Sequence, residues 1–376
     1  MKPIQMVDLK GQYQKIKHQI DTSIQNVIES AAFINGPEVK NFQKDLEEYL
    51  GVKHVIPCAN GTDALQIAMM GLDLQQGDEV ITVDFTFAAT VEVIALLKLT
   101  PVLIDVESYT FNMDIDALKK AITPKTKAIV PVHLFGQCAN MEAILEVAAA
   151  HNLYVIEDTA QAIGADYTFT NGTIKKAGTM GDVGTTSFFP SKNLGCYGDG
   201  GAIVTNNDEL ANTLRGIVNH GMYKRYYHDV IGVNSRLDSI QAAVLSTKLP
   251  YLDAYCDARR KAAEYYNKAF ANSGNIITPI TSDFTTHVFH QYTLRLINVD
   301  RDALHQHLLD KNIANAIYYP VPLHSQKAYA DTRYNEDNFK VTNELVKSVI
   351  SLPMHTEFEE DQLQFITNTI LNFVNK

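Results

Sequence analysis

One lysine stands between a proline and a glycine-rich run in the stretch Ser187-Phe188-Phe189-Pro190-Ser191-Lys192-Asn193-Leu194-Gly195-Cys196-Tyr197-Gly198-Asp199-Gly200-Gly201. Pro190 fixes its own φ and restricts the residue before it, while the glycines let the backbone approach a flat ligand closely. The flanking residues predict two strands, 184–189 and 201–205, joined by this turn. Two interpretations fit the turn by itself: a hairpin with a solvated lysine, or a lysine that forms a Schiff base with a carbonyl cofactor.

The bulk composition limits the class of protein. A chain of 376 residues is long enough for two lobes rather than one simple core. The formal net charge of −11 argues against a nucleic-acid-binding surface. The four cysteines lie far apart, without metal-ligand spacing, and are typical of reduced thiols. The sequence has no signal-peptide pattern and no apolar run of membrane-spanning length, so we expect a cytoplasmic protein that does not act in a membrane.

Strands and helices alternate over the first part of the chain. The strand candidates are residues 53–57, 79–83, 101–105, 127–132 and 153–157, and the helical stretches between them are 64–70, 88–97, 114–121 and 141–150. This alternation predicts parallel crossovers and an α/β sheet covered by helices on both faces. Ligands of such sheets bind beyond the carboxyl ends of the strands. Asn60, His133 and Asp158 each follow a strand candidate, and we expect them to converge on one crevice.

The C-terminal part of the chain has a different pattern. A long helical region, 237–270, is interrupted at Pro250. The candidates that follow are strands at 287–296 and 313–319 and helices at 301–312, 338–349 and 359–374. This pattern predicts a smaller α+β lobe. We therefore divide the chain into an N-terminal segment (1–35), a large domain (36–250) and a small C-terminal domain (251–376).

The tetrapeptide Asn60-Gly61-Thr62-Asp63 lies between a strand candidate and a helix candidate. Backbone N–H groups at a helix N-terminus bind anions, most often phosphate. The same tetrapeptide is also an ordinary helix cap, which is its commoner meaning. If the tetrapeptide binds a phosphate, Ser187, five residues before Lys192, would supply a hydroxyl to the same phosphate.

Asp158 ends an apolar strand and is followed by Thr159, Ala160 and Gln161. If a pyridine ring lies in the crevice, an aspartate paired with its nitrogen keeps that nitrogen protonated and makes the ring an electron sink. Gln161 would then hydrogen-bond the phenolic oxygen of the ring, and Phe87 would stack on its face. The plainer alternatives are a capping carboxylate for Asp158 and a core aromatic for Phe87.

Four motifs together resemble the DegT/DnrJ/EryC1/StrS family of pyridoxal-phosphate-dependent nucleotide-sugar aminotransferases. They are residues 60–63, 157–161, 187–192 and 198–201, and the likeness runs in order from Val7-Asp8-Leu9 to Leu352-Pro353. The resemblance implies fold type I, with a large domain in which helices sandwich a mainly parallel sheet and a smaller C-terminal α+β domain.

The resemblance implies pyridoxal 5′-phosphate as the cofactor, with pyridoxamine phosphate as the intermediate form. Lys192 matches the lysine that bonds to the cofactor, and Asp158 matches the partner of the ring nitrogen, so these are the expected catalytic residues. The expected cofactor-binding residues are Gly61, Thr62, Asp63, Phe87, Asp158, Gln161, Ser187, Lys192 and Asn234. No metal is expected.

The resemblance also implies a homodimer with shared active sites. The segment Asn234-Ser235-Arg236 is similar to one that enters the site of the neighbouring subunit, where Asn234 would reach the phosphate and Arg236 the substrate. The expected substrate-binding residues are Arg236, Tyr318, Tyr319, His324 and His228. Tyr318 stands where relatives often have histidine.

The substrates implied are a nucleotide-linked keto sugar and the amino donor L-glutamate, in the biosynthesis of surface polysaccharide such as lipopolysaccharide or O-antigen. The segment 232–238, Gly-Val-Asn-Ser-Arg-Leu-Asp, is similar to enzymes that aminate C3 of the sugar. Within that group the chain most resembles enzymes acting on UDP-2-acetamido-2-deoxy-3-oxo-glucuronate, with dTDP-3-keto-6-deoxyhexose 3-aminotransferases second.

Three other functions are compatible with parts of the sequence. The sugar 3-dehydrases of the same superfamily replace the Schiff-base lysine with histidine, so Lys192 argues against them. A non-catalytic sensor that binds pyridoxal phosphate would keep the phosphate site and lose other parts, whereas Lys192, Asp158 and Gln161 are all present. A plain nucleotide-binding protein is disfavoured because no Gly-x-Gly-x-x-Gly or Walker pattern follows a strand.

Overall fold

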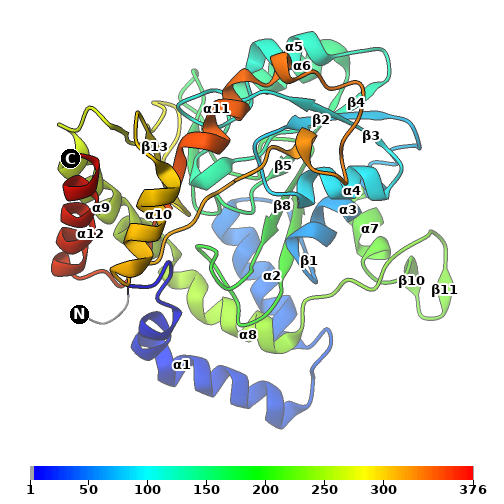
Figure 1. The fold of residues 1–376 in the computed structure, drawn as a ribbon. Coiled ribbons are helices and arrows are strands. Elements are labelled where there is room, and N and C mark those ends of the chain that lie inside the picture. Colours follow the sequence, from blue (N-terminus) through cyan, green and yellow to red (C-terminus); the bar gives the residue numbers. More distant parts are fainter. Residues whose placement is uncertain (1–3, 376) are drawn as a thin grey trace.

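A seven-stranded sheet forms the centre of the computed structural model, which describes residues 4–375 (Figure 1). Its strands are, in spatial order, β1 (His54–Cys58), β9 (Gly201–Thr205), β8 (Val183–Ser187), β5 (Tyr154–Asp158), β4 (Thr126–Val130), β2 (Glu79–Val83) and β3 (Thr100–Ile104). Only β9 runs against its neighbours, pairing antiparallel with both β1 and β8. The mainly parallel α/β sheet expected from the alternating pattern is thus confirmed.

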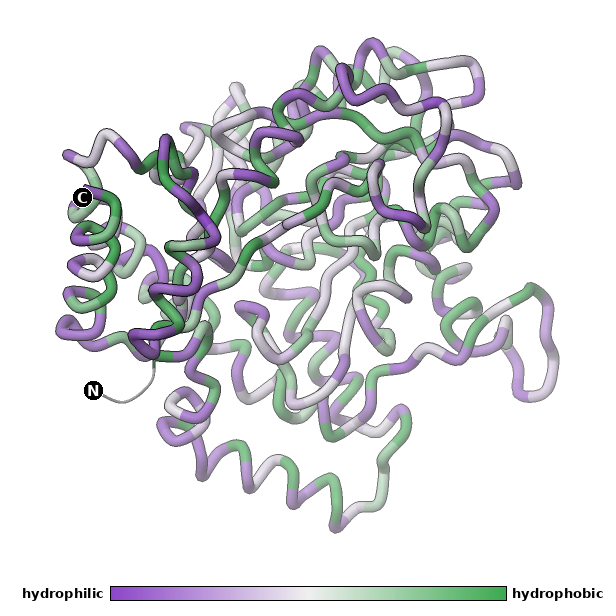
Figure 2. Tube along the Cα trace, in the orientation of Figure 1, coloured by the Kyte–Doolittle hydropathy of each residue, from purple (hydrophilic) through white to green (hydrophobic). Residues whose placement is uncertain are grey.

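Helices cover both faces of this sheet because its strands are apolar on both sides. In β1, for example, Val55 packs into one buried cluster and Ile56 into another, as successive side chains of a strand must. One face carries α2 (Pro37–Leu50), α5 (Ile115–Ala121), α6 (Met141–His151) and α8 (Ser239–Lys248), and the other carries α3 (Gly61–Gly71), α4 (Ala89–Leu96) and α7 (Asp208–Ile217). Figure 2 shows hydrophobic segments running through the middle of the molecule, between outer helices of mixed character.

A second, three-stranded sheet lies in the C-terminal part of the chain. It consists of β12 (Ile276–Ile277), β13 (Tyr292–Leu296) and β14 (Val349–Leu352), all antiparallel. With α9 (Leu252–Phe270), α10 (Arg301–Asp310) and α12 (Glu360–Val374) it encloses a third buried cluster. A short 3-10 turn, Leu249–Tyr251, separates α8 from α9 at the expected break. The division of the chain at 250/251 into two domains stays a prediction.

One strand prediction in this lobe was right only in its second half, and another was wrong. Only β13 forms in the predicted strand 287–296, because residues before it bond to the large sheet's connections instead: Val288 N donates to Gly136 O and Gln291 N to Phe135 O. The predicted strand 313–319 is not a strand, since it makes only isolated bridges, one of them from Ala316 to Ser351. Contacts with distant parts of the chain determine the conformation of both segments. A prediction from β-propensity does not take such contacts into account.

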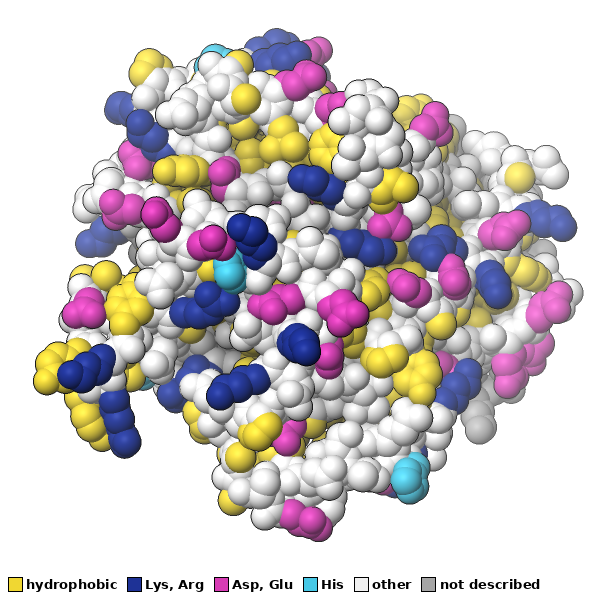
Figure 3. All heavy atoms as spheres, turned by 180° about the vertical axis from the view of Figure 1, so that it is seen from behind, with side chains coloured by type: hydrophobic (Ala, Val, Ile, Leu, Met, Phe, Trp, Pro, Cys, Tyr) yellow, Lys and Arg dark blue, Asp and Glu magenta, His cyan; other side chains and the backbone are white. Residues whose placement is uncertain are grey.

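Two further elements stand away from the body (Figure 1). Helix α1 (Leu9–Ser30) runs below the sheet and contacts α8. An arm of residues 219–234, containing the hairpin β10 (Met222–Lys224) and β11 (Tyr227–His228), projects from the opposite side of the large sheet to α9 and α12. Seen from behind, this arm gathers hydrophobic and basic side chains at one edge of the molecule (Figure 3).

The smaller elements of the structure complete the chain. They are the hairpin β6 (Asp166–Thr168) and β7 (Ile174–Lys176), the helix α11 (Lys340–Ser348), and short 3-10 turns at Leu134–Gly136, Leu323–Ser325 and Glu336–Asn338. Among the helices within residues 4–375, none is both long and apolar enough to cross a membrane.

Candidate active site

A cavity of about 460 Å³ lies at the carboxyl edge of the large sheet, where the parallel strands end. Ten of the residues singled out from the sequence line it: Asn60, Gly61, Thr62, Phe87, Asp158, Gln161, Ser187, Lys192, Tyr318 and Tyr319. They come from the connections after β1, β2, β5 and β8 and from the segment before α11. The topology therefore brings together groups that are up to 259 positions apart in the chain, Asn60 and Tyr319.

Lys192 lies in the connection between β8 and β9, which form the antiparallel hairpin predicted for this stretch. The turn is tightened by a hydrogen bond from Lys192 N to Phe189 O of 2.8 Å. Burial lowers the pKa of the Lys192 amine to about 8, against the opposing charge of Asp158, which raises it. A substantial fraction of this amine is therefore neutral near pH 8, as a nucleophile and proton acceptor requires.

Asp158 ends β5, and its side chain is 6% exposed. Thr90 Oγ1 donates to its Oδ2 at 2.8 Å, and Ala160 N donates to its Oδ1 at 3.2 Å. The carboxylate carries about four lone-pair positions, so two donors leave capacity for a further N–H group in the cavity. Among residues 4–375 it has no ion-pair partner within 4.0 Å. Asp158 is thus a fixed anion that can pair with a cationic nitrogen of a ligand.

The N-terminus of α3 forms the anion-binding end of the cavity. Asn60 caps the helix by accepting from Asp63 N at 2.8 Å, which leaves the N–H groups of Gly61 and Thr62 at the first turn. A Cβ on Gly61 would lie 2.7 Å from the Cβ of Ser187, and a Cβ on Gly201 would lie 2.4 Å from the carbonyl of Asn60. Glycine at both positions therefore lets Ser187 reach the helix N-terminus.

Aromatic and amide groups line the rest of the cavity. Phe87 is 58% exposed although it is a large apolar side chain, and its ring lines the cavity rather than the core. Gln161 accepts from Phe135 N at 2.8 Å through Oε1 and donates to the Tyr319 hydroxyl at 3.2 Å through Nε2. The second hydrogen of that Nε2 is free to bind a ligand oxygen.

Five of the expected site residues do not line this cavity. Asp63 uses its N–H for the Asn60 cap. Asn234 is the last residue of the projecting arm and Arg236 follows it, while His228 lies on the arm with its Nδ1 2.8 Å from His220 O. His324 is buried, with its Nδ1 2.7 Å from Asp84 Oδ2 and its ring stacked on Phe339.

The expectation that His133 faces the crevice was wrong. Its side chain is fully buried and does not line the cavity; its Nε2 lies 2.9 Å from Glu157 Oε2. Residues that follow parallel strands do lie at the same edge of the sheet, but this fixes only the position of their backbone and not the direction of their side chains. The side chain of His133 points to the other face of the sheet because the buried Glu157 carboxylate requires donors there.

Three residues in or against the site were not predicted from the sequence. Thr90, which donates to Asp158, lies within an apolar helix. His290 and Gln291 line the cavity from a segment predicted as strand. Burial, reinforced by the charges of Lys192 and Arg259, lowers the pKa of His290 well below its ordinary value, so a neutral imidazole lies near Lys192. Only tertiary contacts identify these groups.

The donor set fits a planar, anionic, nitrogen-containing ligand. It offers a lysine amine, a carboxylate, a helix N-terminus with a hydroxyl, and an exposed aromatic face within one cavity. Pyridoxal phosphate has the matching aldehyde, ring nitrogen, phosphate and flat ring. Among residues 4–375, no group of three or more His, Cys, Asp or Glu side chains is placed to hold a metal ion.

Sequence comparison matches residues 14–371 to the profile of the DegT/DnrJ/EryC1/StrS aminotransferase family. A pleiotropic regulatory protein of Geobacillus stearothermophilus is 46% identical, over 98% of each chain. UDP-2-acetamido-2-deoxy-3-oxo-D-glucuronate aminotransferase of Pseudomonas aeruginosa is 44% identical, over 98% of this chain and 100% of its own. UDP-N-acetyl-3-dehydro-alpha-D-glucosamine 3-aminotransferase of Acidithiobacillus ferrooxidans is also 44% identical, over 98% and 97%.

Solved structures agree with this likeness over the whole chain. A DegT DnrJ EryC1 StrS aminotransferase from Brucella abortus has a TM-score of 0.94 at 40% identity, covering 99% of this chain and 100% of its own. S. venezuelae DesV, solved in complex with a ketimine intermediate, has a TM-score of 0.95 at 36% identity, covering 100% of both chains.

The lowered pKa of Lys192 predicts its reactivity in the cofactor-free chain. We expect acylation of Lys192 by an amine-specific reagent to rise with pH and to reach half its maximum near pH 8, because only the neutral amine reacts and burial destabilises the ammonium. Peptide mass spectrometry at a series of pH values measures the modified fraction. A midpoint close to the ordinary lysine value of 10.5 would contradict the described burial.

Proposed function

The chain belongs to the DegT/DnrJ/EryC1/StrS aminotransferase family, and we propose that it moves an amino group from L-glutamate to the C3 keto group of a nucleotide-linked sugar. The family's aminotransferases depend on pyridoxal phosphate, and so does this chain. The observation that carries the proposal is the convergence of Lys192, Asp158 and the α3 N-terminus on one cavity. A relative named as a regulatory protein does not change this, because a sensor needs neither the lysine nor the aspartate.

When bound, pyridoxal phosphate supplies an electron-poor ring that withdraws electrons from the carbon bearing the amino nitrogen. Lys192 would hold the cofactor through its amine. Burial lowers the pKa of that amine to about 8 in the cofactor-free site, so its Nζ is suited to accept the proton from the α-carbon of the donor and to give it back. Asp158 would pair with the ring nitrogen and keep it protonated. Use of one cavity first by the donor and then by the keto sugar would give ping-pong kinetics.

The remaining cavity residues bind and orient the cofactor. The N–H groups of Gly61 and Thr62 and the hydroxyl of Ser187 hold the phosphate, where the helix dipole favours negative charge. Phe87 covers one face of the ring with its exposed aromatic side chain. The free Nε2 hydrogen of Gln161 binds the ring oxygen. Tyr318 and Tyr319 line the cavity, where they would contact the substrate.

A second copy of the chain completes the site. The arm presents large apolar side chains to solvent, with Tyr226 75% and Ile231 87% exposed, and such exposure on a projecting element is typical of a protein interface. Asn234 and Arg236 lie at the base of this arm, outside their own chain's cavity. In a two-fold dimer they reach the partner's cavity, where Asn234 contacts the phosphate and Arg236 the sugar.

The acceptor we propose is UDP-2-acetamido-2-deoxy-3-oxo-glucuronate, in surface polysaccharide biosynthesis. Arg236 supports a substrate with a carboxylate, since its guanidinium has no hydrogen bond or ion pair among residues 4–375 and can bind a carboxylate with two parallel bonds. The other basic groups nearby are engaged on the arm: Lys224 lies over Tyr227 and Arg225 over Tyr226. The name of the Pseudomonas aeruginosa relative agrees with this acceptor.

A turnover panel tests the function and the acceptor together. With L-glutamate as donor, we expect the UDP-linked 3-oxo-glucuronate to be used far better than UDP-N-acetyl-3-dehydro-glucosamine or any dTDP-linked 3-keto-6-deoxyhexose. Arg236→Lys keeps the charge but loses the bidentate fork, and it should lower kcat/KM for the uronate about 10-fold or more while changing the other sugars little. A reversed ranking would overturn the acceptor, and no 2-oxoglutarate with any sugar would overturn the function.

Asp158→Asn tests the partner of the ring nitrogen. Loss of one member of a buried charge pair costs about 3–5 kcal/mol. At about 1.4 kcal/mol per tenfold in rate, kcat should fall by at least about 100-fold. The control is Asp105→Asn, because Asp105 caps α11 by accepting from Val341 N and Thr342 N, away from the cavity. Comparable kcat in the two variants would contradict the role of Asp158.

Mixed dimers test the shared site. Lys192→Ala and Arg236→Ala homodimers should both be inactive with the uronate. When their subunits exchange, one of the two sites in each mixed dimer combines an intact Lys192 with an intact Arg236, and activity should return. Subunit exchange is followed with differently tagged chains. Mixed dimers that remain inactive would show that Arg236 acts within its own chain or not at all.

A further inference from the structure

Glu157 carries a buried negative charge that the reaction does not use. It immediately precedes Asp158 in β5 and is fully buried. Successive side chains of a strand point to opposite faces, so Asp158 enters the cavity while Glu157 points away from it. Among residues 4–375, Glu157 has no lysine or arginine partner; its only ion-pair candidate is His133. A buried carboxylate without a cation must be stabilised by hydrogen bonds alone.

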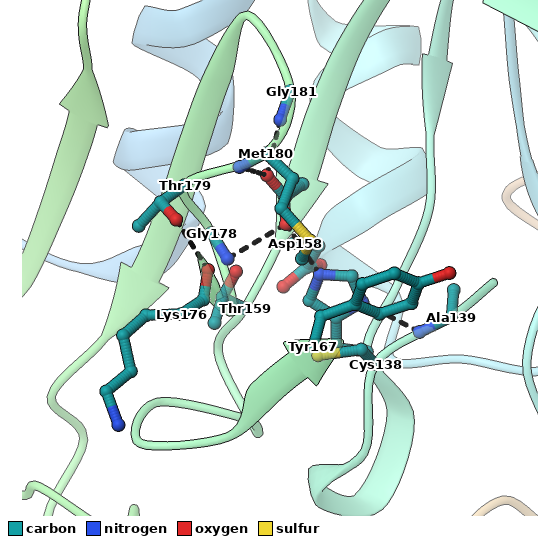
Figure 4. Close-up of polar contacts among 12 residues, drawn as sticks. Cys138, Ala139, Asp158, Thr159, Tyr167, Lys176, Gly178, Thr179, Met180 and Gly181 are labelled. Atoms are coloured by element: carbon teal, nitrogen blue, oxygen red, sulfur yellow. Dashed lines mark hydrogen bonds and ion pairs between the residues drawn. The ribbon is translucent and has the colours of Figure 1, made fainter. Parts of the chain in front are cut away.

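Four N–H groups supply that stabilisation (Figure 4). Gly178 N donates to Glu157 Oε2 at 2.8 Å, and Met180 N and Gly181 N both donate to Oε1 at 2.6 Å. The fourth donor is His133 Nε2, 2.9 Å from Oε2. These distances are in the range of charge-assisted hydrogen bonds, which a carboxylate forms only in its ionised state with donors on every side.

The hydrogen bonds of His133 determine its own protonation. Its Nδ1 accepts from Ala139 N at 3.1 Å, so that nitrogen carries no proton and the ring hydrogen sits on Nε2, facing Glu157. The pair is therefore a neutral imidazole donating to a carboxylate, with one net negative charge. His133 also binds the next residue with its backbone, because His133 N donates to Asp158 O at 3.0 Å. One residue thus holds both Glu157 and Asp158.

The turn that surrounds Glu157 is built to approach it closely. A Cβ on Gly178 would lie 2.8 Å from Thr159 Oγ1, and a Cβ on Gly181 would lie 2.6 Å from Val155 O. Gly178 also has a φ of +85°, which favours glycine. On the far side, a Cβ on Gly184 of β8 would lie 2.0 Å from Gly178 O. The turn is therefore closely packed between β5 and β8, and this packing keeps its N–H groups directed at Glu157.

We propose that Glu157 and His133 are positioning residues that fix the carboxyl end of β5 from the face opposite the cavity, and thereby hold the Asp158 carboxylate in line with the nitrogen of the cofactor ring. The inference rests on the proposed role of Asp158. Misplacement of a catalytic group by about 1 Å can cost about 100-fold in rate, so such a support has a functional consequence. Thr90 and Ala160 then fix the carboxylate itself within the cavity.

Two substitutions of His133 separate its two hydrogen bonds. Gln places an amide at the position of Nε2 and keeps a donor for Glu157, whereas Asn places its amide near Nδ1 and keeps only an acceptor for Ala139. Glu157→Gln is the direct variant: it keeps the shape but turns one acceptor into a donor that faces other donors. Tyr266→Phe is the stability control, because the buried Tyr266 hydroxyl donates to Pro353 O at 3.0 Å in the small lobe.

The readout is the pH midpoint of the absorbance change of the full chain loaded with pyridoxal phosphate, with the Tm of each variant measured alongside. A misaligned Asp158 lets the ring nitrogen lose its proton, and the nitrogen that joins the cofactor to Lys192 becomes more basic as that positive charge is lost. We expect the midpoint to rise by about one pH unit or more in Glu157→Gln and His133→Asn. It should stay within a few tenths of wild type in His133→Gln and Tyr266→Phe, whatever their Tm.

The outcomes are distinguishable. A wild-type midpoint in folded Glu157→Gln, or an equal rise in both His133 variants, would overturn the inference. If Glu157→Gln fails to fold, the two His133 variants decide by the same criterion. Borohydride reduction of the loaded wild-type chain is done first. If it attaches no cofactor to Lys192, the proposed function is overturned, and the inference that rests on it is overturned as well.

Discussion

The hydrogen bonds at the carboxyl end of β5 are the constraint on which the rest of the site depends. Asp158 N donates to Pro131 O at 2.9 Å and Thr159 N to Thr185 O at 2.8 Å, so the strand end is held from β4 and β8 together. The Glu157 carboxylate adds the turn at 178–181 to this junction. With Asp158 fixed in this way, the sheet together with the Lys192 turn and the Asn60 cap sets where Lys192 and the α3 N-terminus lie relative to it.

Burial and charge act in opposite directions on the pKa of Lys192. Removal from water lowers the pKa of Lys192, while the Asp158 carboxylate raises it, and burial has the larger effect. The amine is therefore available as a base near pH 8 although an anion lies in the same cavity. The neutral His290 adds no competing positive charge. A cofactor ring that carries a proton beside Asp158 compensates the anion when it is bound.

The arm is the part of the chain on which the proposed shared site depends. Its tyrosines and Ile231 are exposed, yet they flank the segment with Asn234 and Arg236. Large apolar side chains exposed on a projecting element are typical of an interaction surface. In the proposed dimer this one segment would both form the interface and bring Asn234 and Arg236 to the partner, and assembly would then be coupled to activity.

The features that could be predicted from the sequence are those that local chemistry specifies. The alternation of apolar strand and helix patterns predicted the central strands, and the predicted strands 79–83 and 201–205 coincide with β2 and β9. The turn at Pro190 predicted that Lys192 lies on a hairpin. It also singled out ten residues of the cavity. Side-chain direction was decided only by tertiary structure: His133 follows a strand as Asp158 does but turns to Glu157, and His324 turns to Asp84. Thr90 and His290 joined the site through contacts with residues 68 and 98 positions away, Asp158 and Lys192. Such pairings depend on which buried charges need partners, and that need exists only once the chain has folded around them.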